Sequence, residues 1–228
     1  MRPVIFSYPA ADYNAIAATQ NITTSTGAYV TLNGDLTNVG AQAFTPSGSY
    51  AIFPGIQRTI GVFSTGNLSA VVFYASGLDT RGVVATASFV GASGGSSAAT
   101  DAFATGLGEF HRVNVLFCTA AATSNFTAGT GATGSTRWSR SDIHQDPFNM
   151  TVAVIISGAT TSIMTVQDTP DNAETSTAPV TFNHSSLATV SASAQSNYAY
   201  PARFVRGVVT AMTATAGGAA QLSLLQAG

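Results

Sequence analysis

The glycine-rich stretch 126–142 is where the sequence comes nearest to a known binding motif. Gly129, Gly131 and Gly134 have the Gly-x-Gly-x-x-Gly spacing of a dinucleotide-binding loop. Such a loop holds a pyrophosphate only when a helix begins directly after it, because the free N–H groups at the helix N-terminus bind the phosphates. No apolar repeat at helical spacing follows before Pro147. We therefore interpret the motif as a chance match in a chain with 22 glycines and expect no cofactor.

Residues that commonly bind metals are few and isolated. The three histidines, His111, His144 and His184, form no close pair with each other or with the single cysteine, Cys118. Metal-binding histidines and cysteines normally occur at short, set spacings. Cys118 lies in an apolar run, where a lone thiol packs as a small hydrophobic side chain. We expect no metal site and no internal disulfide bond.

Carboxylates gather only in segment 168–174, which contains Asp168, Asp171 and Glu174. Their spacing departs from the calcium-binding loop pattern, and Pro170 followed by an Asp-Asn pair is typical of a turn. We expect a hairpin loop here, with calcium binding as the alternative. The ten acidic residues offer no obvious pair for glycoside hydrolysis, and no Ser–His–acid order can be identified. The residues alone therefore reveal no catalytic group, although acidic residues distant in the sequence could converge in the fold.

Composition limits the partners of this chain. Charged residues make up 8% of the 228 residues, against about 25% in ordinary soluble domains. There is no lysine, and the formal net charge is −2, so the basic surface that nucleic-acid binding requires is missing. No apolar run reaches the 18 residues that a transmembrane helix needs. A surface so poor in charge favours a protein whose faces are covered by other copies or by a partner.

The elements that position these residues are predicted to be short strands, separated by Gly, Ser-Gly and Thr-Gly turns at intervals near ten residues. This spacing of turns is typical of β-sandwiches and β-barrels. The clearest alternation is in 148–156, where every second residue is apolar. Residues 10–20 are the best candidate for a short turn or helix, and 91–101 are expected to be a flexible loop. We predict an all-β fold of two antiparallel β-sandwich modules, the first jelly-roll-like. The other predicted strands are 28–32, 50–53, 56–64, 68–76, 82–90, 110–119, 162–167, 180–183, 202–213 and 219–226.

The composition shifts once along the chain. Residues 121–147 are small and polar, so we expect them to join two domains. The predicted N-terminal domain is 1–143, with an extended N-terminal arm, and the predicted C-terminal domain is 144–228. The arm contains two prolines that fix extended backbone, and its apolar side chains are expected to be exposed anchors onto a neighbour.

Several segments resemble small β-rich virion proteins of tailed bacteriophages. Segments 147–172, 178–188 and 200–228 are similar to the C-terminal module of such proteins, which opens on a Pro-Phe-Asn strand and closes near a Leu-Gln pair. Segments 54–91 and 124–138 are similar to the N-terminal module. The resemblance implies a non-enzymatic structural role in the virion, after synthesis in the bacterial host cytoplasm.

The role that the resemblance implies first is a capsid decoration (cement) protein that binds and stabilises the major capsid shell. The expected partners are the major capsid protein or head–tail proteins of the same particle, together with other copies of the chain, of which a trimer is the first expectation. The alternatives are a low-copy neck, collar or tail accessory protein, or a carbohydrate-binding module on a host-recognition appendage. The interface candidates are Ile5, Phe6, Tyr8, Tyr13, Arg137, Trp138 and Arg140.

Overall fold

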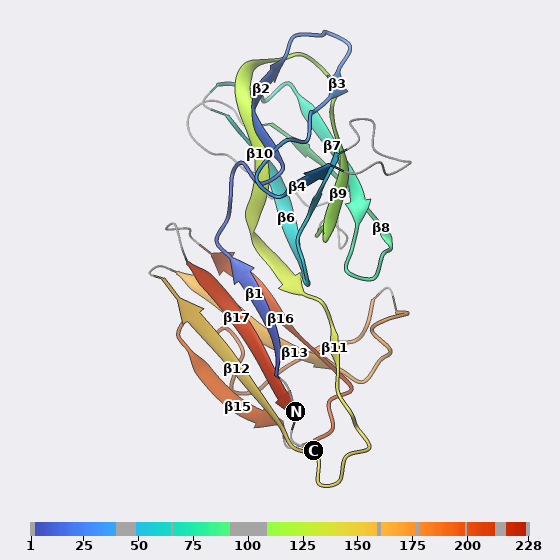
Figure 1. Ribbon diagram of the computed structural model, residues 1–228, viewed down its shortest axis with the longest axis vertical. Helices are drawn as coiled ribbons and strands as arrows, with labels where there is room; N and C mark the ends of the chain where they lie inside the picture. Colours follow the sequence, from blue (N-terminus) through green and yellow to red (C-terminus); the bar gives the residue numbers. More distant parts are fainter. Residues whose placement is uncertain are drawn as a thin grey trace. The chain divides into compact units, whose positions relative to one another are not determined.

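The computed structural model shows an all-β chain with antiparallel sheets (Figure 1). No helix occurs in the parts of the chain that the structure describes. Of the short turn or helix expected in 10–20, the structure has the turn, followed by the start of a strand, because the segment is anchored by backbone hydrogen bonds to residues far along the chain. The described residues are 3–39, 49–64, 66–91, 109–158, 161–176, 178–198, 200–212 and 218–226.

The chain divides into two compact units, and one is inserted into the other in sequence. The terminal unit consists of Met1–Ala10 and Ala132–Gly228, and the inserted unit is Ala11–Gly131. This division differs from the boundary expected at 143/144. The physical reason is that the first strand pairs with the last one, which joins residues from both ends of the chain in one unit.

The terminal unit contains a four-stranded sheet in the order β1-β17-β12-β15. Facing it is a layer of β14, β13 and β16, to which β11 and the end of β10 also pair. The two layers contact each other, since a Cβ placed on Gly207 of β16 would lie 3.5 Å from Leu222 Cδ2 of β17. The strand bounds are β1 (Val4–Pro9), β11 (Ser139–Arg140), β12 (Met150–Ser157), β13 (Ser162–Thr169), β14 (Phe182–Asn183), β15 (Ala194–Tyr198), β16 (Phe204–Met212) and β17 (Ala219–Gln226).

The alternation predicted in 148–156 forms β12. Met150, Val152 and Val154 are buried against the facing layer, and the intervening residues are more exposed. Leu222 and Leu224 of β17 are buried in the same way, and β12 pairs with β17 along its whole length. The period of two in these strands therefore separates a core face from an outer face.

The inserted unit contains a six-stranded sheet in the order β4-β5-β9-β7-β8, with β3 also pairing with β9. Its inner face packs on β10, where Phe73 contacts Phe126 edge-on with ring centroids 5.5 Å apart. This arrangement is consistent with a β-sandwich, and a jelly-roll order stays a prediction. The strand bounds are β2 (Ala17–Ile22), β3 (Ala28–Tyr29), β4 (Thr37–Val39), β5 (Ser49–Ile52), β6 (Ile56–Ser64), β7 (Val72–Leu78), β8 (Val84–Val90), β9 (Arg112–Cys118) and β10 (Ala122–Thr136).

The predicted loop at 91–101 lies almost wholly outside the described residues. The predicted joint at 121–147, in contrast, contains the longest strand of the chain, β10. Its first part pairs with β2 and β6 in the inserted unit, and its end pairs with β16 in the terminal unit. Small side chains suit this strand, since a Cβ on Gly129 would overlap the carbonyl oxygen of Asp12.

Candidate functional surfaces

The N-terminal segment is an edge strand rather than a free arm. β1 pairs antiparallel with β17 from Val4↔Leu224 to Pro9↔Ala219. Phe6 and Tyr8, expected to be exposed, are 5% and 0% exposed, and the Tyr8 hydroxyl donates to the Thr133 carbonyl at 2.6 Å. The expectation of exposed anchors is therefore wrong for these two residues, because alternation along a strand turns every second side chain into the core.

Ile5, the remaining arm residue, is 58% exposed. It pairs with Ser223 of β17 and so lies on the outer face of the four-stranded sheet. Of the seven interface candidates, Ile5 is the one that the structure places on an extended open sheet face.

Arg137, Trp138 and Arg140 lie in or beside β11 of the terminal unit. The Arg206 guanidinium carbon is 4.5 Å from the centre of the Trp138 ring, and Trp138 is half-buried. Arg137 lies over Phe6 at 5.4 Å, and both Arg137 and Arg140 are exposed. A role of these three residues at an interface stays a prediction.

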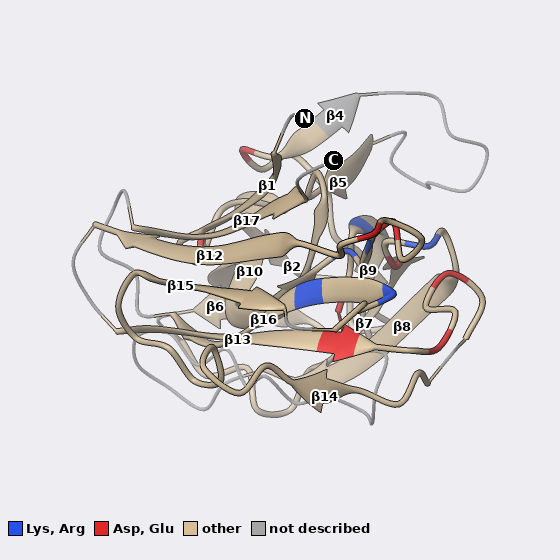
Figure 2. Cartoon of the chain, turned by 90° about the horizontal axis from the view of Figure 1, so that it is seen from below, with Lys and Arg blue, Asp and Glu red and all other residues tan. Residues whose placement is uncertain are grey.

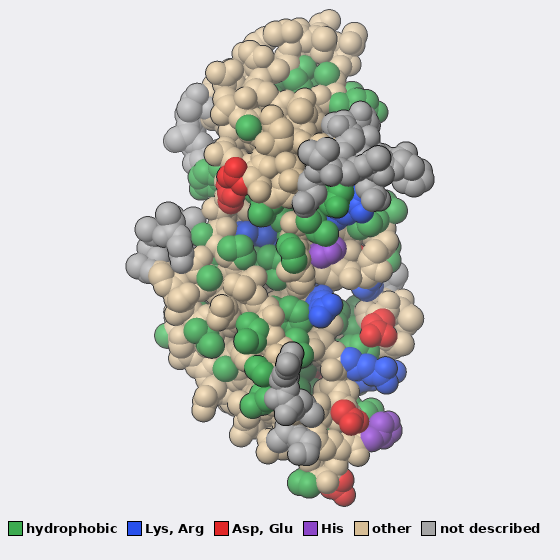
Figure 3. Space-filling model, in the orientation of Figure 1, with side chains coloured by type: hydrophobic (Ala, Val, Ile, Leu, Met, Phe, Trp, Pro, Cys, Tyr) green, Lys and Arg blue, Asp and Glu red, His purple; other side chains and the backbone are tan. Residues whose placement is uncertain are grey.

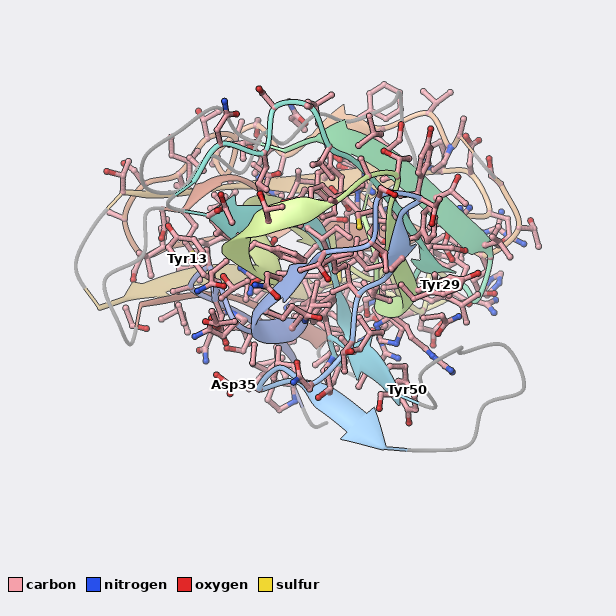
Figure 4. All side chains as sticks on the ribbon, turned by 90° about the horizontal axis from the view of Figure 1, so that it is seen from above. Tyr13, Tyr29, Asp35 and Tyr50 are labelled. Atoms are coloured by element: carbon pink, nitrogen blue, oxygen red, sulfur yellow. The ribbon has the colours of Figure 1, made fainter. Side chains whose placement is uncertain are left out.

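Tyr13 belongs to the other unit, so the interface candidates are not one cluster. Its ring packs on Phe63 at a tilt of 35°, with centroids 4.0 Å apart, and it is 47% exposed. In Figure 4 it lies well apart from Tyr29, another exposed tyrosine of the inserted unit.

The glycine-rich motif has no geometry for binding phosphate. Gly129, Gly131 and Gly134 all lie within β10, whose backbone is engaged in pairing with neighbouring strands. The chain continues into β11 rather than into a helix. The helix N-terminus that the motif requires is therefore missing at this place.

Asp168 is not in a hairpin loop, as was expected, but near the end of β13, where it is 4% exposed. Its Oδ1 accepts hydrogen bonds from the hydroxyls of Tyr198 and Tyr200, both at 3.3 Å. His184 contacts the Tyr198 ring edge-on at 4.7 Å. We call these four residues the Asp168 cluster.

Burial raises the pKa of Asp168, and the tyrosine hydrogen bonds and His184 counteract part of this rise. Burial also raises the pKa of Tyr198 and of Tyr200, with the Asp168 charge as the second cause. The cluster favours neutral side chains joined by hydrogen bonds. It contains no activated nucleophile of the kind that covalent catalysis requires.

The rest of the acidic segment forms local turns. Asp171 Oδ2 accepts from the Val180 N–H at 2.7 Å, and Asn172 Oδ1 accepts from the Glu174 N–H at 3.2 Å. Within the described residues no three His, Cys, Asp or Glu side chains are grouped so that they could hold a metal ion. The geometry thus gives the calcium alternative no ligand set, because Asp168 faces the core and Asp171 is used by the backbone.

Two open sheet faces are the remaining candidates. The first is the outer face of the four-stranded sheet, which we call the neutral face. No charged side chain occurs on the described strands of this sheet (Figure 2). Over β12 and β17 the space-filling view shows hydrophobic and uncharged atoms and neither sign of charge (Figure 3). Exposed apolar residues on this face are Ile5, Ile155 and Leu225.

The second is the outer face of the six-stranded sheet in the inserted unit. Strand register places Tyr29 opposite Phe117, and Phe117 opposite Tyr74. Tyr29 and Tyr74 are 57% and 50% exposed, and the Tyr29 and Phe117 rings meet edge-on, with centroids 5.3 Å apart and planes inclined at 66°. We call this line of three rings the aromatic row. No local sequence motif marks it, because the three residues are distant in the chain.

The comparisons with known proteins add no family to this description. The sequence matches no model of a known protein family, and no curated protein is similar to it. Among the described residues, no helix is long and apolar enough to cross a membrane.

Proposed function

We propose that the chain is a non-enzymatic structural protein of a tailed-phage virion, a decoration protein that binds and stabilises the capsid shell. The observation that carries this proposal is the neutral face. Free sheet faces and edge strands of soluble proteins normally carry charged side chains, lysine above all, which keep other chains away. A face without charge is suited to being covered, because the centre of an interface is depleted of charged residues.

The size of the neutral face fits one contact among several. Four strands spaced about 4.8 Å apart and about seven residues long on average give a flat footprint of roughly 440 Å². A typical specific interface uses about 800 Å² on each partner. One such face therefore provides a weak contact, and many copies on a symmetric shell, or an oligomer of this chain, would strengthen attachment through multivalency.

The proposed partner is the major capsid protein, with a homo-oligomer of this chain, such as a trimer, as the attached form. The second candidate is a low-copy neck, collar or tail position in the same particle. The same uncharged face would serve there, and the number of copies per particle separates the two positions.

The test uses particles that lack this protein and are then supplied with purified variants. Ile155→Arg places a charge on the neutral face, where Ile155 is 42% exposed, and should abolish attachment. The matched control is Val180→Arg, because Val180 is 59% exposed in the same unit but lies outside the four-stranded sheet. Equal attachment of both variants would contradict the proposal that this face binds the shell.

The cement role has a separate readout. Particles with bound wild-type protein should release their DNA at a higher temperature than particles without it, because added buried interface stabilises the assembled state. Unchanged heat stability with full attachment would contradict the cement role and leave the attachment itself in place.

A further inference from the structure

The aromatic row is a built feature of the six-stranded sheet. Neighbouring strands lie about 4.8 Å apart, so Tyr29 and Tyr74, two strand spacings from each other, are separated by ~10 Å with Phe117 between them. Strand β8 continues the line with Ser88, which pairs with Tyr74. The alternation of exposed and buried residues in β7 and β8 fixes which side chains face outward.

Hydroxyl groups lie directly beside the rings. The next outward positions along β7 and β8 are Ser76 and Thr86, which pair with each other. With Ser88, they give three short hydroxyl side chains next to Tyr74, at one end of the aromatic row. Each hydroxyl can both donate and accept a hydrogen bond, which matches the hydroxyl groups of a sugar.

The outward positions of β7, β8 and β9 hold no carboxylate. Asp35, one of the acidic residues of the inserted unit, lies well apart from Tyr29 (Figure 4). Cleavage of a glycosidic bond needs two carboxyl groups on either side of that bond, so this face has the groups for binding and not for hydrolysis.

We propose that the aromatic row binds a neutral oligosaccharide, with pyranose rings packing on the exposed rings of Tyr29 and Tyr74, on either side of Phe117. The C–H groups on one side of a pyranose ring form an apolar face that packs on an aromatic ring, while its hydroxyls extend sideways toward Ser76, Thr86 and Ser88. Aromatic rings supply a large apolar contact of defined geometry. The row of about 10 Å accommodates two linked sugar rings.

This inference goes beyond the structural role proposed above and does not depend on it. Attachment to the particle is assigned to the neutral face of the terminal unit, and sugar binding to the inserted unit. A chain with both properties would display a sugar-binding surface on the virion. Either property can be present without the other.

The experiment measures binding of the full chain to cello-, malto-, manno- and chito-oligosaccharides by isothermal titration calorimetry. We expect at least one of these probes to bind saturably with a dissociation constant of about 1 mM or tighter. Tyr29→Ala and Tyr74→Ala should each weaken that binding about tenfold, because each removes one stacking ring. Tyr29→Phe and Tyr74→Phe should keep most of it, since the ring remains.

The matched control is Val84→Ala, on the same sheet face and 63% exposed but outside the aromatic row. It should leave sugar binding unchanged. Binding of none of the four probes would overturn the proposal, and so would equal binding by wild type and the two alanine variants. A third outcome is that a virion protein binds this face, that no sugar binds, and that Tyr74→Ala and Val84→Ala weaken the protein binding equally. This outcome would identify a protein-docking face and would also overturn the proposal of sugar binding.

Discussion

The burial of β1 gives the sharpest stability prediction, because neighbouring residues of one strand should behave in opposite ways. Phe6 is 5% exposed and Ile5 is 58% exposed. Removing a buried phenylalanine side chain costs about 3–5 kcal/mol, whereas an exposed substitution usually changes stability by less than about 0.5 kcal/mol. Phe6→Ala should therefore strongly destabilise the terminal unit, and Ile5→Ala should not.

The assay is urea unfolding followed by tryptophan fluorescence. Trp138 is the only tryptophan of the chain and lies in the terminal unit, so its signal reports that unit. With a denaturant slope of about 2 kcal/mol per M, the midpoint of Phe6→Ala should fall by roughly 2 M. Tyr8→Phe should lower stability by about 1 kcal/mol, because the half-buried Thr133 loses the hydrogen bond that the Tyr8 hydroxyl donates to its carbonyl at 2.6 Å.

The refuting result is equally specific. If Ile5→Ala and Phe6→Ala both left the Trp138 transition unchanged, residues 4–9 would not pack on β17, and the segment would be a free arm after all. If both lowered the midpoint equally, the assignment of faces along β1 would be wrong.

Three further predictions concern other parts of the core. Burial raises the pKa of Asp168, so the stability that protonated Asp168 contributes should be complete below the ordinary aspartate pKa and be lost as the pH rises through the raised pKa. Asp168→Asn should remove this loss, so at neutral pH the variant should unfold at a higher urea concentration than wild type, as followed by Trp138 fluorescence. Gly129→Ala should destabilise the inserted unit by about 3 kcal/mol, because its Cβ would overlap the Asp12 carbonyl. Cys118 is buried, so a thiol reagent should label it only when the inserted unit unfolds. The labelling rate therefore also measures the destabilisation caused by Gly129→Ala. Rapid labelling of the native wild-type protein would contradict the burial of Cys118.

The strands with regular apolar alternation could be predicted from the sequence. Strands β6 and β17 begin and end at the predicted residues 56–64 and 219–226, and β12 covers most of the predicted alternating segment 148–156 and ends one residue beyond it. In β12 and β17 the side chains alone separate a buried face from a more exposed one, whereas β6 is buried on both faces. The all-β class followed from these strands and from the spacing of the turns.

Strand β10 could not be predicted, because its residues are mostly Gly, Ala, Thr and Ser, which are typical of loops. It is a strand because partners far away in the sequence, β2, β6 and β16, bond to its backbone. The inserted unit was missed for a related reason. Nothing in the composition marks the junction of Ala10 and Ala11, and only the pairing of β1 with β17 assigns residues 1–10 to the terminal unit.

The candidate surfaces differ in how far the sequence could reveal them. A neutral surface followed directly from 8% charged residues and the lack of lysine. The aromatic row could not be found, because Tyr29, Tyr74 and Phe117 become neighbours only through the register of three strands. Register depends on tertiary packing, and a shift by one residue would turn these rings into the core.

The most direct test of the proposed function is the copy number of this protein in purified virions, measured by quantitative peptide mass spectrometry against the major capsid protein. The decoration role predicts a fixed ratio, with a copy number comparable to that of the shell subunits. A few copies per particle would assign the protein to the neck or tail instead. Its absence from purified particles would contradict the virion role altogether.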